Sequence, residues 1–497
     1  MTVATGPEDR DVIPRWRSLG ATVASGELGQ QVADAELDEQ GEDELERSWR
    51  AWEADPSLIS TAELVSAGLV LGVPGRVEEA ARSLRRESLP AGVQHLVEAV
   101  LSRAHPSEQD PPSVQSGPPT SDPRRRARRL KAALAQDPRR AIAWLELGRI
   151  YAALGQSDSA RGAIRAAVAL APDDRFVLRS ASCFFVNAKE ADRAHRLLAN
   201  AQVTAADPWL MAAELATAQA ADARPRYLKR AKQLLESGDF RERDVSELAS
   251  EVGTFELRSG ADRRARRLFA RATGDPTENA LAQVEWASRR SSGLELSTTN
   301  LSLPSAYEAR AQHWLEAGKW RPGAEAAQLW LEDQPFSTVA AMVASYGVLT
   351  GLQDYSLGLT LAEHGLRIDA NDPVLLNNAA YASVELSDYA RAAAYLKRAA
   401  NSTVTGGDRV ALLATAGMLA YRLGDLEEGR DGYRTAIRSA RASRDVAREA
   451  MAATMMAREE KLIGGEMAEE LRRQAEKLAQ GTTSAAVQLW LSFLQDD

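Results

Sequence analysis

The chain of 497 residues has 61 Lys and Arg against 70 Asp and Glu, and its formal net charge of -9 disfavours general nucleic-acid binding. Aromatic residues make up only 6 %, and Ala, Leu, Arg and Glu are abundant, which favours helices over strands. Cys183 is the only cysteine, so an intrachain disulfide and a cysteine-based zinc site are both excluded. Its apolar surroundings, "SASCFFV", predict a buried, unreactive thiol.

Residues 1–103 are expected to form a helical N-terminal region. The opening "MTVATGPEDRDVIPRW" lacks the apolar core of a signal peptide. The longest apolar stretch, "LVSAGLVLGVPG", is too short to span a bilayer. We therefore expect a cytoplasmic protein without membrane insertion.

Three tryptophans of this region are candidate docking residues. Trp49 and Trp52 fall on one helical face with Leu45, and Trp16 lies in "IPRWRSLG". Tryptophan and arginine are frequent anchors of protein interfaces. The simpler interpretation is that these side chains pack the N-terminal helices together.

Residues 104–123 are rich in Pro and Ser and read as a flexible linker. The basic run "DPRRRARRLKAALAQDP" follows at residues 122–138. It could bind phosphate or an acidic partner. Its apolar positions favour another interpretation, the second helix of a truncated repeat with its cationic face in water.

A repeating pattern starts in "WLELGRIYAALGQSDSARGAIRAAVALAPDD", residues 144–174. Two apolar stripes at helical spacing predict an antiparallel helix pair, with small residues where the helices meet, a glycine in the turn and a proline at the end. The positions that carry this pattern are Trp144, Leu147, Gly148, Tyr151, Gly155, Ala160, Ile164, Ala167 and Pro172.

The same spacing recurs along the chain. Ala194, Leu198 and Ala201 continue the register after 34 residues, and four later copies include "VGTFELRSGADRRARRLFARATGDP" and "LLATAGMLAYRLGDLEEGRDGYRTAI". The pattern resembles the tetratricopeptide repeat (TPR) over about residues 124–480. The resemblance implies an all-α fold, a right-handed superhelix of antiparallel helix pairs.

We expect a first array at 124–290 and a second at 305–497. The Ser- and Thr-rich stretch 291–304 is expected to be a connecting loop. The final helix, "SAAVQLWLSFLQ", should cap the array through Val487, Trp490, Leu491 and Leu494.

No phosphate-binding glycine loop is present, and the five histidines lie far apart in the sequence. Each repeat of a solenoid is expected to contact only its neighbours, so a catalytic site built from distant residues is disfavoured. We predict no enzymatic activity and no metal or cofactor.

The resemblance implies that first helices of the repeats line a concave groove. Candidate partner-binding residues there are Arg149, Gln312, Asn377, Asn378, Tyr381, Met418 and Arg422. The Lys, Asn and Arg set that holds a C-terminal carboxylate in chaperone-binding TPR domains is missing. Asn378 matches the backbone-gripping Asn of other TPR proteins in one repeat only.

The leading functional interpretation is a non-enzymatic scaffold or adaptor that binds partner proteins, with self-association as a further option. The alternative is a regulatory or sensor subunit of a bacterial multi-protein system, in signalling, secretion or phage defence. A third reading, from another class, is an enzyme with its site in residues 1–103, where few catalytic residue types occur. The N-terminal region could also fold back into the groove and occlude it.

Overall fold

The computed structural model describes residues 15–16, 39–70, 73–84, 97, 100–101, 123–291, 293–294, 296–303, 305–402 and 406–495. These residues form helices, turns and loops without a strand. The chain divides into two compact units, Met1–Arg17 with Asp122–Asp497, and Ser18–Ser121. The expected linker lies outside the described residues except for Pro123.

The smaller unit contains α2 (Glu39–Ala54), α3 (Leu58–Val70), a 3-10 turn (Pro74–Val77) and α4 (Glu78–Leu84). Leu45, Leu64 and Val77 are buried in its own apolar core. The described residues of this unit are thus mostly helical over α2, α3 and α4.

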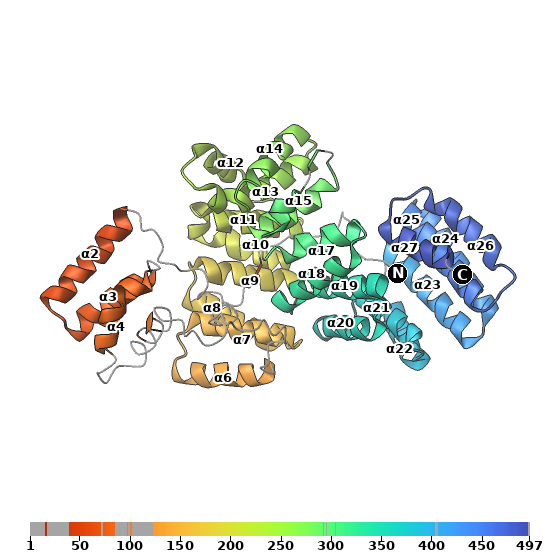
Figure 1. The fold of residues 1–497 in the computed structure, drawn as a ribbon, viewed down its shortest axis with the longest axis horizontal. Helices are drawn as coiled ribbons and strands as arrows, with labels where there is room; N and C mark the ends of the chain where they lie inside the picture. The colour runs from red at the N-terminus through yellow and green to blue at the C-terminus, as the bar shows by residue number, and fades with distance from the viewer. Residues whose placement is uncertain are drawn as a thin grey trace. The chain divides into compact units, whose positions relative to one another are not determined.

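The larger unit is an array of antiparallel helix pairs (Figure 1). Its helices are α6 (Pro123–Gln136), α7 (Ala141–Ala153), α8 (Ser157–Leu170), α9 (Arg175–Asn187), α10 (Ala191–Asn200), α11 (Pro208–Ala220), α12 (Leu228–Ser237), α13 (Glu242–Arg258), α14 (Asp262–Ala272), α15 (Glu278–Ser288), α16 (Thr298–Leu301), α17 (Tyr307–Glu316), α18 (Trp320–Asp333), α19 (Thr338–Gly347), α20 (Tyr355–Ile368), α21 (Pro373–Glu385), α22 (Tyr389–Ala400), α23 (Gly406–Leu423), α24 (Leu426–Ala442), α25 (Val446–Leu462), α26 (Ala468–Ala479) and α27 (Ala485–Gln495).

The pair α7–α8 illustrates why the sequence folds this way. A Cβ at Gly148 would lie 2.9 Å from Cδ1 of Ile164, so glycine sets the close approach of the two helices. Ala160 and Ile164 are fully buried in the pair. Gly155 ends the first helix with φ +71°, the left-handed conformation of a helix C-terminal turn.

The expected loop between the arrays does not interrupt the packing. It contains α16, a short helix that its Ser- and Thr-rich sequence did not predict. Leu281 on α15, Leu301 on α16 and Ala309 on α17 form one apolar cluster. The core therefore runs continuously from the first array into the second.

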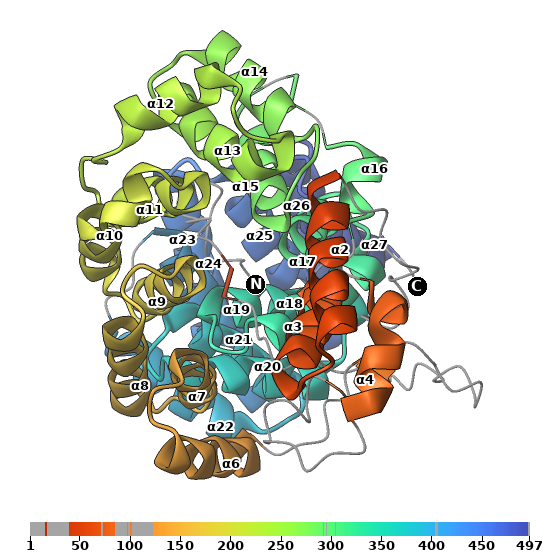
Figure 2. The ribbon, with the colours of Figure 1, turned by 90° about the vertical axis from the view of Figure 1, so that its left-hand side faces the viewer.

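Helices far apart in the sequence also touch. Lys189, after α9, forms an ion pair with Asp369, after α20. A Cβ at Gly155 would lie 2.0 Å from the main-chain oxygen of Arg367. Figures 1 and 2 both show α7–α9 beside α19 and α20. The expectation that repeats contact only their neighbours is wrong here, because the array curves back on itself.

Both ends of the array pack as the sequence suggests. Val487, Trp490, Leu491 and Leu494 on α27 are buried in the core. At the other end, Leu134 on α6 is buried while most arginines of that helix are exposed. The basic run is therefore a helix that packs on α7 with its cationic face in water.

Candidate functional site

The seven side chains expected to line the groove are mostly inside the array. Six of them are less than a tenth exposed, namely Arg149, Gln312, Asn377, Asn378, Tyr381 and Met418. Arg422 is partly exposed. Their role in binding a partner stays a prediction, whereas their role in packing is visible.

Asn377 and Asn378 join neighbouring repeats. The side-chain nitrogen of Asn378 donates to Ser345 Oγ (3.0 Å), and Thr415 Oγ1 donates to Asn377 Oδ1 (2.8 Å). The first helices α19, α21 and α23 are thus linked by buried hydrogen bonds.

Arg422 belongs to a buried charge cluster in the C-terminal repeats. Its Nε donates to Glu459 Oε2 at 2.7 Å, and it lies 3.6 Å from Glu385. Arg458 contacts both carboxylates. Burial raises the pKa of Glu459 despite these cations. The two arginines of the cluster thus face two carboxylates, so its formal charges cancel.

Trp49 and Trp52 lie in the smaller unit. Their rings meet edge to face at 5.4 Å, and both pack partly buried on that unit's core. The indole of Trp52 donates to Thr61 Oγ1 (3.0 Å). This arrangement agrees with the packing interpretation, and docking stays a prediction.

Trp16 lies elsewhere, in the apolar core of the solenoid. It is fully buried between Phe184 on α9 and Phe336, with ring centroids at 6.3 and 5.0 Å. Phe336 lies in the turn between α18 and α19, where Pro335 prevents the helix from continuing. Arg15 and Trp16, the described residues of the N-terminal segment, therefore pack on the array.

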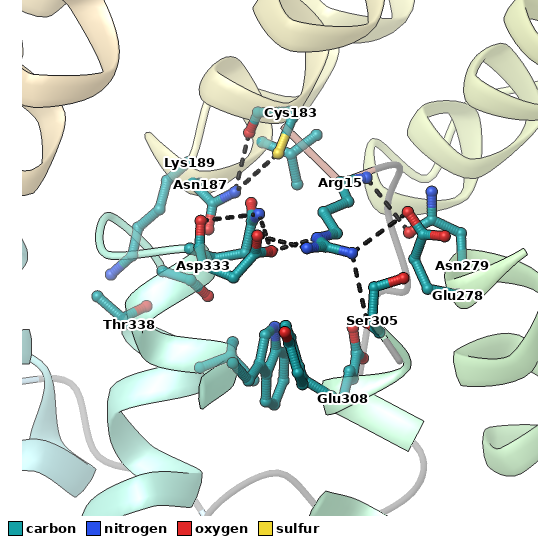
Figure 3. A pocket seen from close by; sticks show the side chains of 16 residues that line it. Arg15, Cys183, Asn187, Lys189, Glu278, Asn279, Ser305, Glu308, Asp333 and Thr338 are labelled. Atoms are coloured by element: carbon teal, nitrogen blue, oxygen red, sulfur yellow. Dashed lines mark hydrogen bonds and ion pairs between the residues drawn. The ribbon is translucent and has the colours of Figure 1, made fainter. Parts of the chain in front are cut away.

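Arg15 lines the adjoining pocket, and its guanidinium points towards Asp333 (Figure 3). Its Nε and Nη2 donate to the two carboxylate oxygens of Asp333, the last residue of α18. Nη1 lies 3.3 Å from Glu278 on α15, and the guanidinium covers the ring of Tyr307 at 5.6 Å. Burial alone would lower the pKa of Arg15, but Asp333 and Glu278 leave it raised.

The main chain of the segment is held too. The N–H of Trp16 donates to Oε1 of Gln334 (3.3 Å), and Nε2 of Gln334 donates to the Trp16 carbonyl (3.2 Å). The N–H of Arg15 donates to Oδ1 of Asn279 (3.3 Å). We call this set, Asp333, Gln334, Phe336, Phe184 and Glu278, the Asp333 site.

Two further residues support the Asp333 site. Arg149, from α7, donates to the main-chain oxygen of Asp333 and lies 6.0 Å from the Phe336 ring. Burial lowers the pKa of Arg149, with Glu146 and Asp333 opposing that shift. Cys183 is buried beside the segment, and burial raises the pKa of its thiol to about 12.

The sequence pattern pointed to Trp16 and Arg149 but not to Arg15, Asp333, Gln334 and the two phenylalanines. A usable signal existed in "PRWR", where a tryptophan stands between two arginines after a proline, and in "EDQPF", a polar turn before a proline. Neither signal shows which partner it meets.

No metal site is visible in the described part of the chain, where no three His, Cys, Asp or Glu side chains converge suitably. Within that part, every helix is too short or too polar to cross a membrane.

The description "tetratricopeptide repeat" matches residues 126–179, the stretch from α6 into α9. Residues 126–179 therefore carry the tetratricopeptide-repeat pattern. No match was found among curated protein sequences.

Several solved structures are similar to this chain over most of their length. The APC/C hetero-tetramer Cut9-Hcn1 aligns with 92 % of this chain and 93 % of that one, at 11 % identity and a TM-score of 0.36. Yeast Tom70 aligns over 92 % of both chains at 13 % identity and a TM-score of 0.31. Human IFIT1 aligns with 90 % of this chain and 96 % of that one, at 11 % identity and a TM-score of 0.32. At these TM-scores the likenesses add no argument.

Proposed function

We propose that this protein is a non-enzymatic scaffold that binds partner proteins through its TPR solenoid. The supporting observation is the Asp333 site, which holds two residues from another part of the chain through their side chains and main chain. Contacts of this kind are those through which a protein surface recognises a peptide segment. The solenoid can therefore hold a peptide segment without any change in the structure of its repeats.

The filled site also supports the alternative of a regulatory or sensor subunit. A site occupied from within the same chain opens only when the occupant leaves. A partner or trigger that competes with Arg15 and Trp16 would then change what the scaffold exposes. This role requires that Arg15 and Trp16 can leave the Asp333 site and return to it.

The scaffold proposal is tested by affinity purification of the full chain from its native host, followed by reconstitution from purified components. We expect a partner at near one-to-one yield that binds the purified chain directly. A parallel purification with Trp490→Ala, which damages the C-terminal core, should reduce recovery. Failure to recover a direct, stoichiometric partner with any variant would contradict the scaffold proposal.

A further inference from the structure

We infer that the Asp333 site is a recognition site for a partner segment in which an arginine precedes a large aromatic residue, and that Arg15 and Trp16 are its tethered occupant. The inference rests on the proposed scaffold function and names the chemistry of the segment bound at this site. A partner with such a segment replaces the occupant.

The site selects arginine by geometry and charge. Asp333 accepts from Nε and Nη2 together, a side-on pairing that a lysine ammonium cannot reproduce. Asp333 also ends α18, where the helix dipole makes an unpaired carboxylate unfavourable and a cation favourable. Glu278 adds a second negative charge at 3.3 Å, and the guanidinium lies over the Tyr307 ring at a cation–π distance.

The second position selects an aromatic ring by shape. Trp16 is fully buried between Phe184 and Phe336. Its indole Nε1 has no hydrogen-bond partner among the described residues. The site therefore recognises the aromatic ring and not the indole N–H. We expect it to accept phenylalanine at the position of Trp16 but not alanine.

Gln334 fixes the register of the segment. Its side chain pairs with both the N–H and the carbonyl of Trp16, as a neighbouring strand would. These hydrogen bonds use main-chain groups, which every residue except proline has. Gln334 can therefore form the same hydrogen bonds with a segment from another protein.

Space beside the pair would accommodate more of a partner. A cavity of about 190 Å³ adjoins Arg15 and is lined by Glu278, Glu308 and Asp333. A second, of about 210 Å³, is lined by Phe184, Phe336 and Lys189. A segment that fills these volumes makes contacts that Arg15 and Trp16 do not make, and so it can outcompete them.

Because Arg15 and Trp16 belong to the same chain as the Asp333 site, a free peptide has to compete with them. A segment joined to its own site acts at an effective concentration on the order of millimolar. A free peptide of the same sequence must therefore bind the wild-type chain weakly, and it binds well only after the occupant is removed.

The test uses the full chain and a fluorescein-labelled peptide of residues 11–20, "DVIPRWRSLG". The vacated variant carries Arg15→Ala and Trp16→Ala. By fluorescence anisotropy we expect the peptide to bind the vacated variant at least about tenfold more tightly than the wild type. Arg50→Ala, which removes an exposed cation from the smaller unit, serves as the charge-matched control.

Side-chain selectivity is tested in the vacated background. Asp333→Asn should weaken peptide binding at least about tenfold, because it removes a charge-assisted pair. Glu332→Gln, at the exposed neighbouring position, should leave binding unchanged. A peptide with Trp→Phe should still bind, and peptides with Trp→Ala or Arg→Lys should bind poorly.

Equal peptide binding by wild type and vacated variant, or no effect of Asp333→Asn, overturns the inference. If circular dichroism shows the vacated variant to be unfolded, the single variants Arg15→Ala and Trp16→Ala replace it with the same expected ranking. A wild-type dimer that the vacated variant loses would show a second copy as the occupant's host and overturn occupancy within one chain. A native partner whose binding ignores Asp333→Asn would leave the scaffold proposal standing while this inference fails.

Discussion

Arg15 pairs side-on with the carboxylate of Asp333, although the two residues are 318 positions apart in the sequence. Asp333 is at the same time held through its main-chain oxygen by Arg149, from the start of the array. One turn between α18 and α19 thus joins the N-terminal segment, the first repeat and the second array.

Trp16→Ala should cost less stability than its burial suggests. Truncating a core tryptophan costs about 3–5 kcal/mol, and we expect that loss for Trp490→Ala on α27. If the segment can leave while the repeats stay folded, the loss for Trp16→Ala is limited to its docking free energy, about 2 kcal/mol or less. Guanidinium denaturation followed by circular dichroism compares the two, and equal losses would make Trp16 a permanent part of the core.

Gly155→Ala should open the contact between the first repeat and α20. Gly155 and Gly260 share positive φ values, +71° and +79°, so alanine is strained at both. Only at Gly155 would the new Cβ meet another main chain, the Arg367 oxygen at 2.0 Å. We expect Gly155→Ala to lose about 1–3 kcal/mol more than Gly260→Ala in denaturation experiments. Similar losses would show that the contact contributes little.

Arg422→Ala should act on stability, although the sequence placed Arg422 in a partner-binding groove. In the wild type Arg422 pairs with Glu459, whose side chain is 1 % exposed. In Arg422→Ala this buried carboxylate loses one of its cations. Removing one partner of a buried pair costs about 3–5 kcal/mol, and since Arg458 stays near Glu459 we expect about 2 kcal/mol. Arg438→Ala, from an exposed pair at 3.9 Å, should cost about 0.5 kcal/mol or less in the same denaturation assay. Unchanged stability in Arg422→Ala would favour the binding role.

His364 should make the array less stable in mild acid. Its Nε2 donates to the Pro335 carbonyl (2.7 Å), and its Nδ1 accepts from Arg367 (2.8 Å), so the folded chain holds the neutral ring. Burial, with Arg367 adding to it, keeps the folded pKa below the ordinary value of 6.5. The unfolded chain therefore binds more protons just below pH 6.5, and the free energy of unfolding falls as the pH falls through that window.

Denaturation of wild type and His364→Gln at about pH 7.5 and pH 5.5 isolates the histidine. We expect a smaller loss on acidification in His364→Gln, because glutamine does not titrate. Parallel losses in the two proteins would assign the pH dependence to other groups.

The helix pairs were predictable because local spacing determines them. Gly148 and Ile164 lie 16 positions apart and meet within one repeat, so periodicity alone places them together. The buried cap through Trp490 follows from the same periodicity. Cys183 was also expected to be buried, although its neighbour Trp16 was not foreseen.

The Asp333 site was not predictable for a different reason. Whether Asp333 meets Arg149 depends on the curvature of the array, which sums small rotations over many repeats. The burial of the predicted groove residues has a more local cause. A first helix such as α21 packs on both sides against the first helices of its neighbours, so Asn377 and Asn378 are buried between repeats and not displayed.

Alkylation of Cys183 tests the central claim, that Arg15 and Trp16 close the Asp333 site reversibly. The thiol is the only one in the chain and lies buried beside Trp16, with its pKa raised to about 12. We predict slow alkylation by N-ethylmaleimide in the wild type, alkylation at least about tenfold faster in the vacated variant, and renewed protection by the peptide of residues 11–20. Equal rates in the wild type and the vacated variant, with no effect of the peptide, would contradict the account.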